Sequence, residues 1–146
     1  MKANELRIGN YVKVSTPAIT CDNFRVEEIR WVDCEYVIRH YPVAEHYYFC
    51  LEGFLRHAEP IPITPELLER CGFKNNVDEY YLDEKDITCI WRGDGLDIAE
   101  KGGRYYLWEE CQDPWYSGCR IEVKSLHGLQ NLYYALTGEE LTITWN

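Results

Sequence analysis

The sequence predicts an α+β fold, in which antiparallel sheets are covered by one amphipathic helix near the C-terminus. Three observations indicate this fold. Short segments of alternating apolar and polar residues recur along most of the chain, which is the period of half-buried strands. The turns between the later segments are short and rich in glycine and charged residues, as in hairpins. Finally, residues 125–138 carry apolar side chains at helical spacing.

The predicted closing helix has clear end signals. Ser125 is expected to cap its N-terminus, because a serine hydroxyl accepts a hydrogen bond from a free amide of the first turn. Gly138 is expected to end it in a left-handed conformation. A closing strand is predicted over residues 141–145. One helix face of about 120° should turn toward a sheet, and its members are Leu126, Leu129, Leu132, Tyr133 and Leu136.

The sequence of residues 1–59 predicts a small β lobe, which is either an SH3-like barrel or a curled sheet. Residues 6–14 are typical of a strand, a turn at Gly9-Asn10 and a second strand. The alternation of residues 24–31 slips by one position at Glu27-Glu28, which suggests a β-bulge. Further strands are expected at 36–38 and 46–51.

Residues 60–146 predict an α+β lobe that forms one compact unit with the first. Its first element is a short helix, which Thr64 caps and Pro65 begins, and which Gly72 ends. An antiparallel meander should follow, with strands at residues 80–82, 87–91, 96–98, 104–108 and 119–123.

The composition indicates the compartment of the protein and the classes of partner it can bind. Among 146 residues, 46% are hydrophobic, which is ample for a packed core, and no run is long enough to span a membrane. The N-terminal residues lack the apolar core of a signal peptide, so a cytoplasmic protein is expected. The net charge of −10 argues against direct nucleic-acid binding and is compatible with a basic partner.

Several chemistries have no support in the sequence. The seven cysteines contain no C-x-x-C pair, and the four histidines are scattered, so no metal site is predicted. The glycines around Asp94 lack the spacing and the lysine of a phosphate-binding loop. No residue pattern indicates a catalytic group, and no cofactor is predicted.

Two segments are candidates for recognition. Trp115 and Tyr116 follow a proline in a polar loop, and exposed aromatic residues of this kind are frequent interface anchors; alternatively, Trp115 folds back onto the sheet. The predicted helix also has a contiguous polar face, which is either a recognition surface or simply solvated. That face consists of His127, Gln130, Asn131 and Tyr134.

Three motifs carry a resemblance to known sequences. They are ELRIGNYV at the start, PIPITPELLERCGF in the middle and HGLQNLYYALTGEEL at the end. In this order they resemble a family of small uncharacterised proteins encoded in gut anaerobes and in their phages and mobile elements. The resemblance spans nearly the whole chain. It implies an intracellular, mobile-element setting, and it implies no activity.

These observations favour a non-enzymatic protein-interaction module of mobile-element or phage origin, acting on a host protein. A small enzyme or small-ligand binder with a pocket between the lobes is the first alternative. A second is an acidic DNA mimic that occupies the basic groove of another protein. A homo-oligomer formed through aromatic edge strands is a further alternative.

Overall fold

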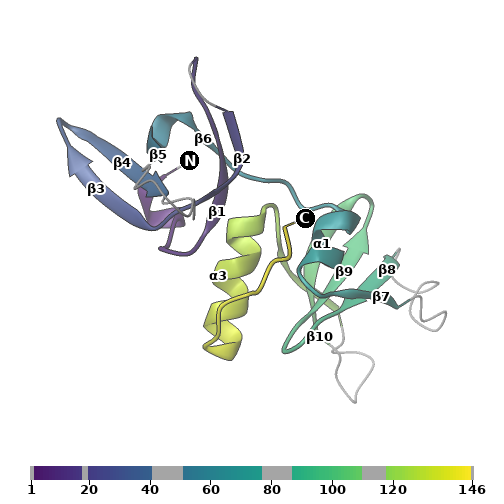
Figure 1. Ribbon diagram of the computed structural model, residues 1–146. Coiled ribbons are helices and arrows are strands. Elements are labelled where there is room, and N and C mark those ends of the chain that lie inside the picture. Colours follow the sequence, from purple (N-terminus) through teal and green to yellow (C-terminus); the bar gives the residue numbers. More distant parts are fainter. Residues whose placement is uncertain (1, 18–19, 41–50, 77–86, 110–117, 146) are drawn as a thin grey trace. The chain divides into compact units, whose positions relative to one another are not determined.

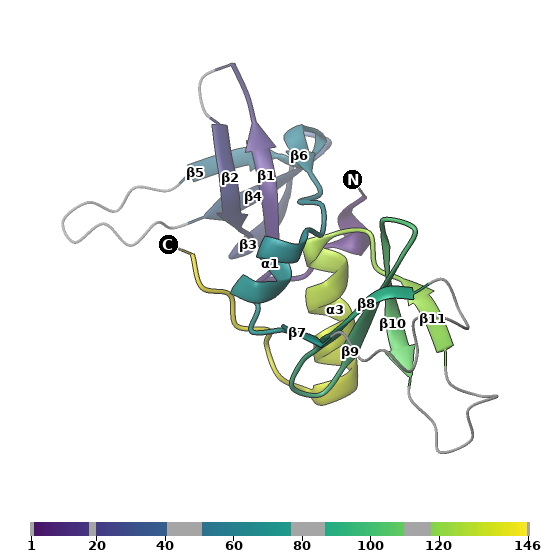
Figure 2. The ribbon, with the colours of Figure 1, turned by 90° about the vertical axis from the view of Figure 1, so that its right-hand side faces the viewer.

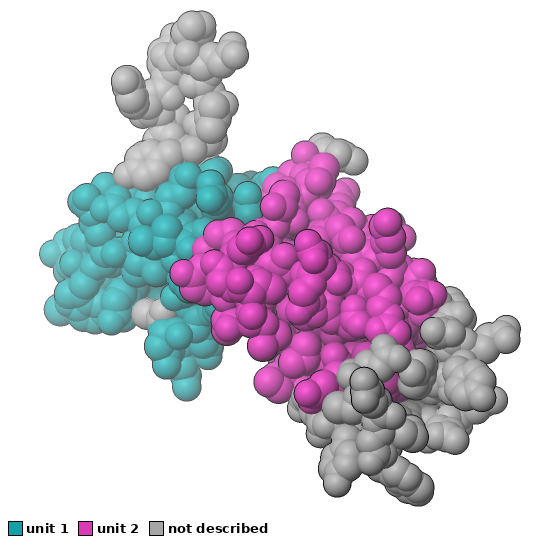
Figure 3. All heavy atoms as spheres, turned by 90° about the horizontal axis from the view of Figure 1, so that it is seen from below, with its two compact units in different colours: residues 1–62, 125–131 teal, residues 63–124, 132–146 magenta. Residues whose placement is uncertain are grey.

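The computed structural model describes residues 2–17, 20–40, 51–76, 87–109 and 118–145 (Figures 1 and 2). The chain divides into two compact units, which Figure 3 colours separately. Unit 1 consists of Met1–Pro62 and Ser125–Asn131, and unit 2 of Ile63–Lys124 and Leu132–Asn146. The division passes through the last helix, whereas the sequence assigns that whole helix to the second lobe.

The described part of unit 1 contains two antiparallel three-stranded sheets. The first has the order β2-β1-β6 and the second the order β3-β4-β5. Two 3-10 helices accompany them, η1 (Ala3–Glu5) and η2 (Leu55–His57). The strands are β1 (Tyr11–Ser15), β2 (Thr20–Arg25), β3 (Glu28–Val32), β4 (Glu35–His40), β5 (Leu51–Phe54) and β6 (Ala58–Glu59).

The core of unit 1 follows from the two-residue period of its strands. Val12 and Val14 alternate with polar neighbours along β1, so both point to the same buried side. They pack with buried residues of β2, the link between β2 and β3, β4, η2 and β6, namely Phe24, Val26, Ile38, Leu55 and Ala58. The described strands form no closed barrel but two separate three-stranded sheets, where the sequence predicts an SH3-like barrel or a curled sheet.

The predicted β-bulge at Glu27-Glu28 is wrong. The Val26 amide donates to the Asn10 carbonyl at 2.8 Å, and the Glu27 amide donates to the Arg39 carbonyl at 2.9 Å. Asn10 lies next to the first sheet and Arg39 belongs to the second. The slip in alternation therefore marks the point where the chain passes from one sheet to the other.

The start of the chain also differs from the prediction. No strand forms over residues 6–8, and η1 precedes a turn in which Gly9 has a φ of +95°. The Asn10 side chain stabilises this turn, because its Oδ1 accepts a hydrogen bond from the Arg7 amide at 2.7 Å. Asn10 is completely buried. Where the sequence predicts a strand, a turn and a second strand, the structure therefore has a turn followed by one strand, β1.

Unit 2 is built on an antiparallel sheet of order β11-β10-β9-β8-β7. The predicted meander is confirmed for β8 to β11, and β7 is a strand that the sequence did not predict. The predicted strand at residues 80–82 lies outside the described residues. A register shift between β10 and β11 changes the phase of β11, which explains why Ile121 is exposed. The strands are β7 (Lys74–Asn76), β8 (Ile87–Arg92), β9 (Asp97–Lys101), β10 (Arg104–Glu109) and β11 (Gly118–Glu122).

The short helix of unit 2, α1 (Pro65–Arg70), forms as the sequence predicts. The Thr64 side chain accepts a hydrogen bond from the Leu67 amide, and Pro65 occupies the first turn. Leu67 and Leu68 are buried, and Gly72 ends the helix with a φ of +84°.

The last helix, α3 (Leu126–Thr137), also has the predicted ends. Ser125 Oγ accepts from the Gly128 amide at 3.3 Å, and the Gly138 amide donates to the Tyr134 carbonyl at 2.8 Å. Leu129 is fully buried, but Leu136 is 54% exposed, so the prediction that all its leucines face inward is wrong for Leu136.

The predicted closing strand is absent from the described residues. Leu141 is buried, and burial alternates over residues 141–145, but these residues form no ladder. A single backbone bond joins the Thr144 amide to the Arg70 carbonyl at 3.0 Å. The α+β class is confirmed, and no helix of the described part is long and apolar enough to cross a membrane.

Candidate functional site

The polar face predicted for the last helix does form, but half of it is buried. Gln130 is only 1% exposed and His127 is also buried, whereas Asn131 is half-buried. Tyr134 alone is well exposed. A recognition surface or solvated face made of all four side chains is therefore wrong for His127 and Gln130.

Gln130 binds the backbone of the N-terminal turn of unit 1. Its Oε1 accepts a hydrogen bond from the Tyr11 amide at 2.8 Å, and its Nε2 donates to the Gly9 carbonyl at 3.1 Å. One side-chain amide thus satisfies a donor and an acceptor of the main chain where β1 begins. Both bonds span about 120 residues of sequence, since the separations are 119 and 121.

Asn131 extends the same contact. Its Nδ2 donates to the Glu5 carbonyl at 3.0 Å, while its Oδ1 accepts from Asn10 Nδ2 at 3.0 Å and from Arg7 Nε at 3.2 Å. We call Gln130 and Asn131, with their partners in residues 5–11, the amide clamp. The clamp fixes the N-terminal turn to the first half of α3, so these two amides serve an internal structural role.

His127 lies beside the helix cap. Its Nδ1 is 3.1 Å from Ser125 Oγ, and the Ser125 side chain also accepts from the Gly128 amide. Burial lowers the pKa of His127 below its usual value of 6.5; the Glu5 carboxylate opposes this shift, and the N-terminal ammonium adds to it. The imidazole is therefore neutral at pH 7 in the folded chain.

This pKa makes stability depend on pH. Below about pH 6.5, His127 binds a proton in the unfolded chain but stays neutral in the folded chain. The free energy of unfolding therefore falls as the pH falls, by up to about 1.4 kcal/mol per pH unit. We expect His127→Gln to reduce the loss of stability between about pH 7 and pH 5 in urea titrations. Equal slopes for wild type and His127→Gln would contradict the assignment.

The other predicted recognition segment, with Trp115 and Tyr116, lies outside the described residues. An exposed aromatic pair does occur in unit 1, on the hairpin formed by β3 and β4. Trp31 is 62% exposed and Tyr36 is 42% exposed, and their ring centroids are 4.6 Å apart in an edge-to-face arrangement. The sequence shows this hairpin as alternating residues, but it does not show that the core ends before Trp31.

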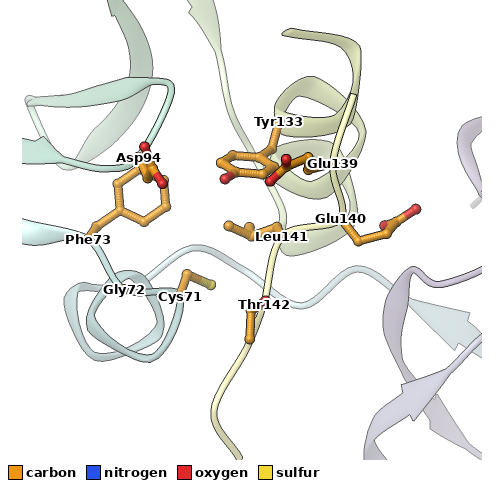
Figure 4. Close-up of a pocket in the computed structure, with 9 residues that line it drawn as sticks. All are labelled: Cys71, Gly72, Phe73, Asp94, Tyr133, Glu139, Glu140, Leu141 and Thr142. Atoms are coloured by element: carbon orange, nitrogen blue, oxygen red, sulfur yellow. The ribbon is translucent and has the colours of Figure 1, made fainter. Parts of the chain in front are cut away.

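Unit 2 contains a cavity of about 290 Å³ between the end of α1, the turn after β8 and the segment that follows α3 (Figure 4). Its apolar side consists of Cys71, Phe73, Tyr133 and Leu141, all of which are buried. Its polar side consists of Asp94, Glu139, Glu140 and Thr142, all exposed to solvent, and Gly72 completes the lining.

The backbone conformations of three glycines direct the chain segments that line the cavity. Gly72 and Gly138 both have a left-handed φ and turn the chain at the ends of α1 and α3. Gly95 also has a left-handed φ, and a Cβ there would lie 2.5 Å from Thr137 Cγ2. The turn that carries Asp94 therefore lies against the last turn of α3, which brings its carboxylate to the same cavity as Glu139.

Among the described lining residues, no nucleophile is paired with a base. Burial raises the pKa of Cys71 to about 12, so its thiol stays protonated at neutral pH. None of the described lining residues is a histidine. In the part of the chain that the structure describes, no group of three or more His, Cys, Asp and Glu side chains is placed to hold a metal ion.

Comparison with protein-family models, with curated proteins and with solved structures finds no match for this chain.

Proposed function

We propose that the protein is a non-enzymatic protein-interaction module and that the tip of the β3–β4 hairpin is its contact surface. The observation that carries the proposal is the exposed aromatic pair of Trp31 and Tyr36. Buried aromatic anchors dominate the binding energy of protein interfaces, and tryptophan and tyrosine are the commonest of them.

The exposed pair continues a face that is already used for packing. Ile29 lies opposite Ile38 and Trp31 lies opposite Tyr36, so the two pairs succeed each other on one face of the hairpin. Ile38 is fully buried and Ile29 packs against the core of unit 1. The apolar face thus extends beyond the core that covers it, and a partner would cover the remainder.

The tip is pre-organised for binding. Asp33 and Cys34 connect the two strands and have φ values of +47° and +66°, the signs expected of a type I′ turn. Such conformations are strained for residues other than glycine and persist where the surrounding structure imposes them. A rigid tip loses little conformational entropy when a partner binds.

Charged residues occupy the other face of the hairpin, because side chains alternate along each strand. Arg30 is paired with Glu28, and Arg56 is paired with Glu35. These partly exposed pairs contribute little to stability. The predicted mobile-element origin suggests a host protein as that partner, and we place the encounter in the cytoplasm.

The test is capture from a lysate of the host, followed by reconstitution with the purified partner. We expect Trp31→Ala to weaken binding at least thirtyfold, which corresponds to about 2 kcal/mol for an anchor tryptophan. Leu136→Ala removes another exposed apolar side chain, on α3, and should bind like the wild type. Unchanged affinity of Trp31→Ala would refute the assignment of the hairpin.

Size-exclusion chromatography identifies one particular partner. Because β3 is an edge strand of its sheet, a second copy of the chain is able to pair there. If the wild type is a dimer and Trp31→Ala is a monomer, the hairpin mediates self-association. If both the wild type and the variant are monomers, the partner is a different protein.

A further inference from the structure

The cavity of unit 2 has the composition of a site for an organic cation. We propose that it binds the ammonium or guanidinium end of an alkyl chain, which is the chemistry of a lysine or arginine side chain. The site lies entirely in unit 2, whereas the hairpin belongs to unit 1. The proposal is therefore independent of the function assigned to the hairpin, and each can fail without the other.

The charge of the lining favours a cation. Asp94 lines the cavity from the turn after β8 and Glu139 lines it from the segment after α3, whereas the Glu140 carboxylate points away from the other lining side chains (Figure 4). None of the nine lining residues carries a positive charge. Carboxylates gathered around one opening raise the local concentration of cations.

Tyr133 supplies a second, independent observation. It is only 9% exposed, and its side chain lies among the cavity residues in Figure 4. None of the hydrogen bonds found among the described residues involves its hydroxyl. The hydroxyl is not one of the enclosed polar atoms without a partner, so its oxygen faces open space and is available to accept a hydrogen bond from the N–H of a bound cation.

The apolar side of the cavity accounts for the alkyl chain. Phe73 and Leu141 are buried there and offer a surface against which the methylene groups of a lysine or arginine stem can pack. The rings of Phe73 and Tyr133 also provide faces that attract cations.

Titration of the full chain with simple probes tests the proposal by isothermal calorimetry and by NMR shifts of Leu141. Acetyl-lysine amide and acetyl-arginine amide, blocked at the α-amino group, present the two cationic side chains. Acetyl-norleucine amide presents an alkyl chain without the charge. We expect millimolar dissociation constants for at least one cationic probe, and binding at least tenfold weaker for the norleucine probe.

Variants locate the binding. Tyr133→Phe removes only the hydroxyl and should weaken binding of the cationic probe about tenfold, whereas Tyr134→Phe, the neighbouring exposed tyrosine, should have no effect. Asp94→Asn combined with Glu139→Gln should weaken it about fivefold, and Glu69→Gln, on α1 but outside the lining, should not. Circular dichroism of each variant confirms folding.

The outcomes are distinct. Absence of saturable binding for both cationic probes, equal binding of the norleucine probe, or an unchanged constant for Tyr133→Phe would each overturn the proposal. Spermidine is the arm for a free polyamine: tighter binding than the amino-acid probes identifies a small-molecule ligand. Weaker binding of spermidine identifies a lysine or arginine side chain of a protein.

Discussion

Replacing Leu129 with alanine is expected to lower the free energy of unfolding by about 3 kcal/mol. Leu129 is fully buried on α3, so truncation removes its packing contacts and leaves a cavity in the interior. Leucine and alanine have similar helix propensities, so the loss is a packing effect and not a helix effect. Urea denaturation followed by circular dichroism measures it directly.

Leu136→Ala is the matched control, on the same helix seven residues later. Because Leu136 is largely exposed, we expect a change of less than about 0.5 kcal/mol. Similar losses for the two variants would mean that α3 buries all its leucines, as the sequence pattern alone predicts, and would contradict the observed orientation of the helix.

Gln130→Ala is expected to lower the free energy of unfolding by about 3 kcal/mol as well, although the residue is polar. Without the side-chain amide, the Tyr11 N–H and the Gly9 carbonyl lose the partners they have in the amide clamp. An unsatisfied buried polar group costs about 1 to 3 kcal/mol. Thermal and urea denaturation of the same variant should agree on the loss.

Tyr134→Ala is the control for the clamp, because Tyr134 belongs to the same predicted polar face and is exposed. We expect it to change stability by less than about 0.5 kcal/mol. A Gln130→Ala variant as stable as Tyr134→Ala would show that the whole face is solvated.

The parts of the fold that local sequence determines were predictable. Thr64 and Ser125 cap their helices, and Gly72 and Gly138 end them with a left-handed φ, because each of these effects acts within one helical turn. The strands of the meander were also predictable from alternation and turn residues. The closing strand was not, because strand formation needs a neighbouring strand that the sequence of residues 141–145 does not reveal.

The orientation of α3 could not be read from its own residues. At 100° per residue, the buried positions lie on an arc displaced by roughly 80° from the leucine face, toward Gln130 and His127. The cause is the N-terminal turn, more than a hundred residues away, which presents backbone groups to the two amides. From the helical periodicity alone, glutamine and asparagine are expected to face solvent. The periodicity contains no information about hydrogen-bond partners that are distant in the sequence.

The candidate sites show the same division between local and distant causes. The alternation of Ile29 and Trp31 is visible in the sequence, yet only the structure shows that the core covers Ile29 and leaves Trp31 exposed. The cavity of unit 2 combines residues from three separate segments around positions 71, 94 and 139. No spacing rule in the sequence joins them.

The central structural claim is that the polar face of α3 is used inside the protein, which leaves recognition to other surfaces. Amide hydrogen exchange at Tyr11 tests it most directly, because the Tyr11 N–H is the group that Gln130 accepts from. In the wild type we predict that the Tyr11 amide exchanges at least about a hundredfold more slowly than an unprotected amide, which corresponds to a free energy of local opening of about 2.8 kcal/mol. In Gln130→Ala we predict an exchange rate close to that of an unprotected amide. Exchange at the rate of an unprotected amide in the wild type would contradict the claim.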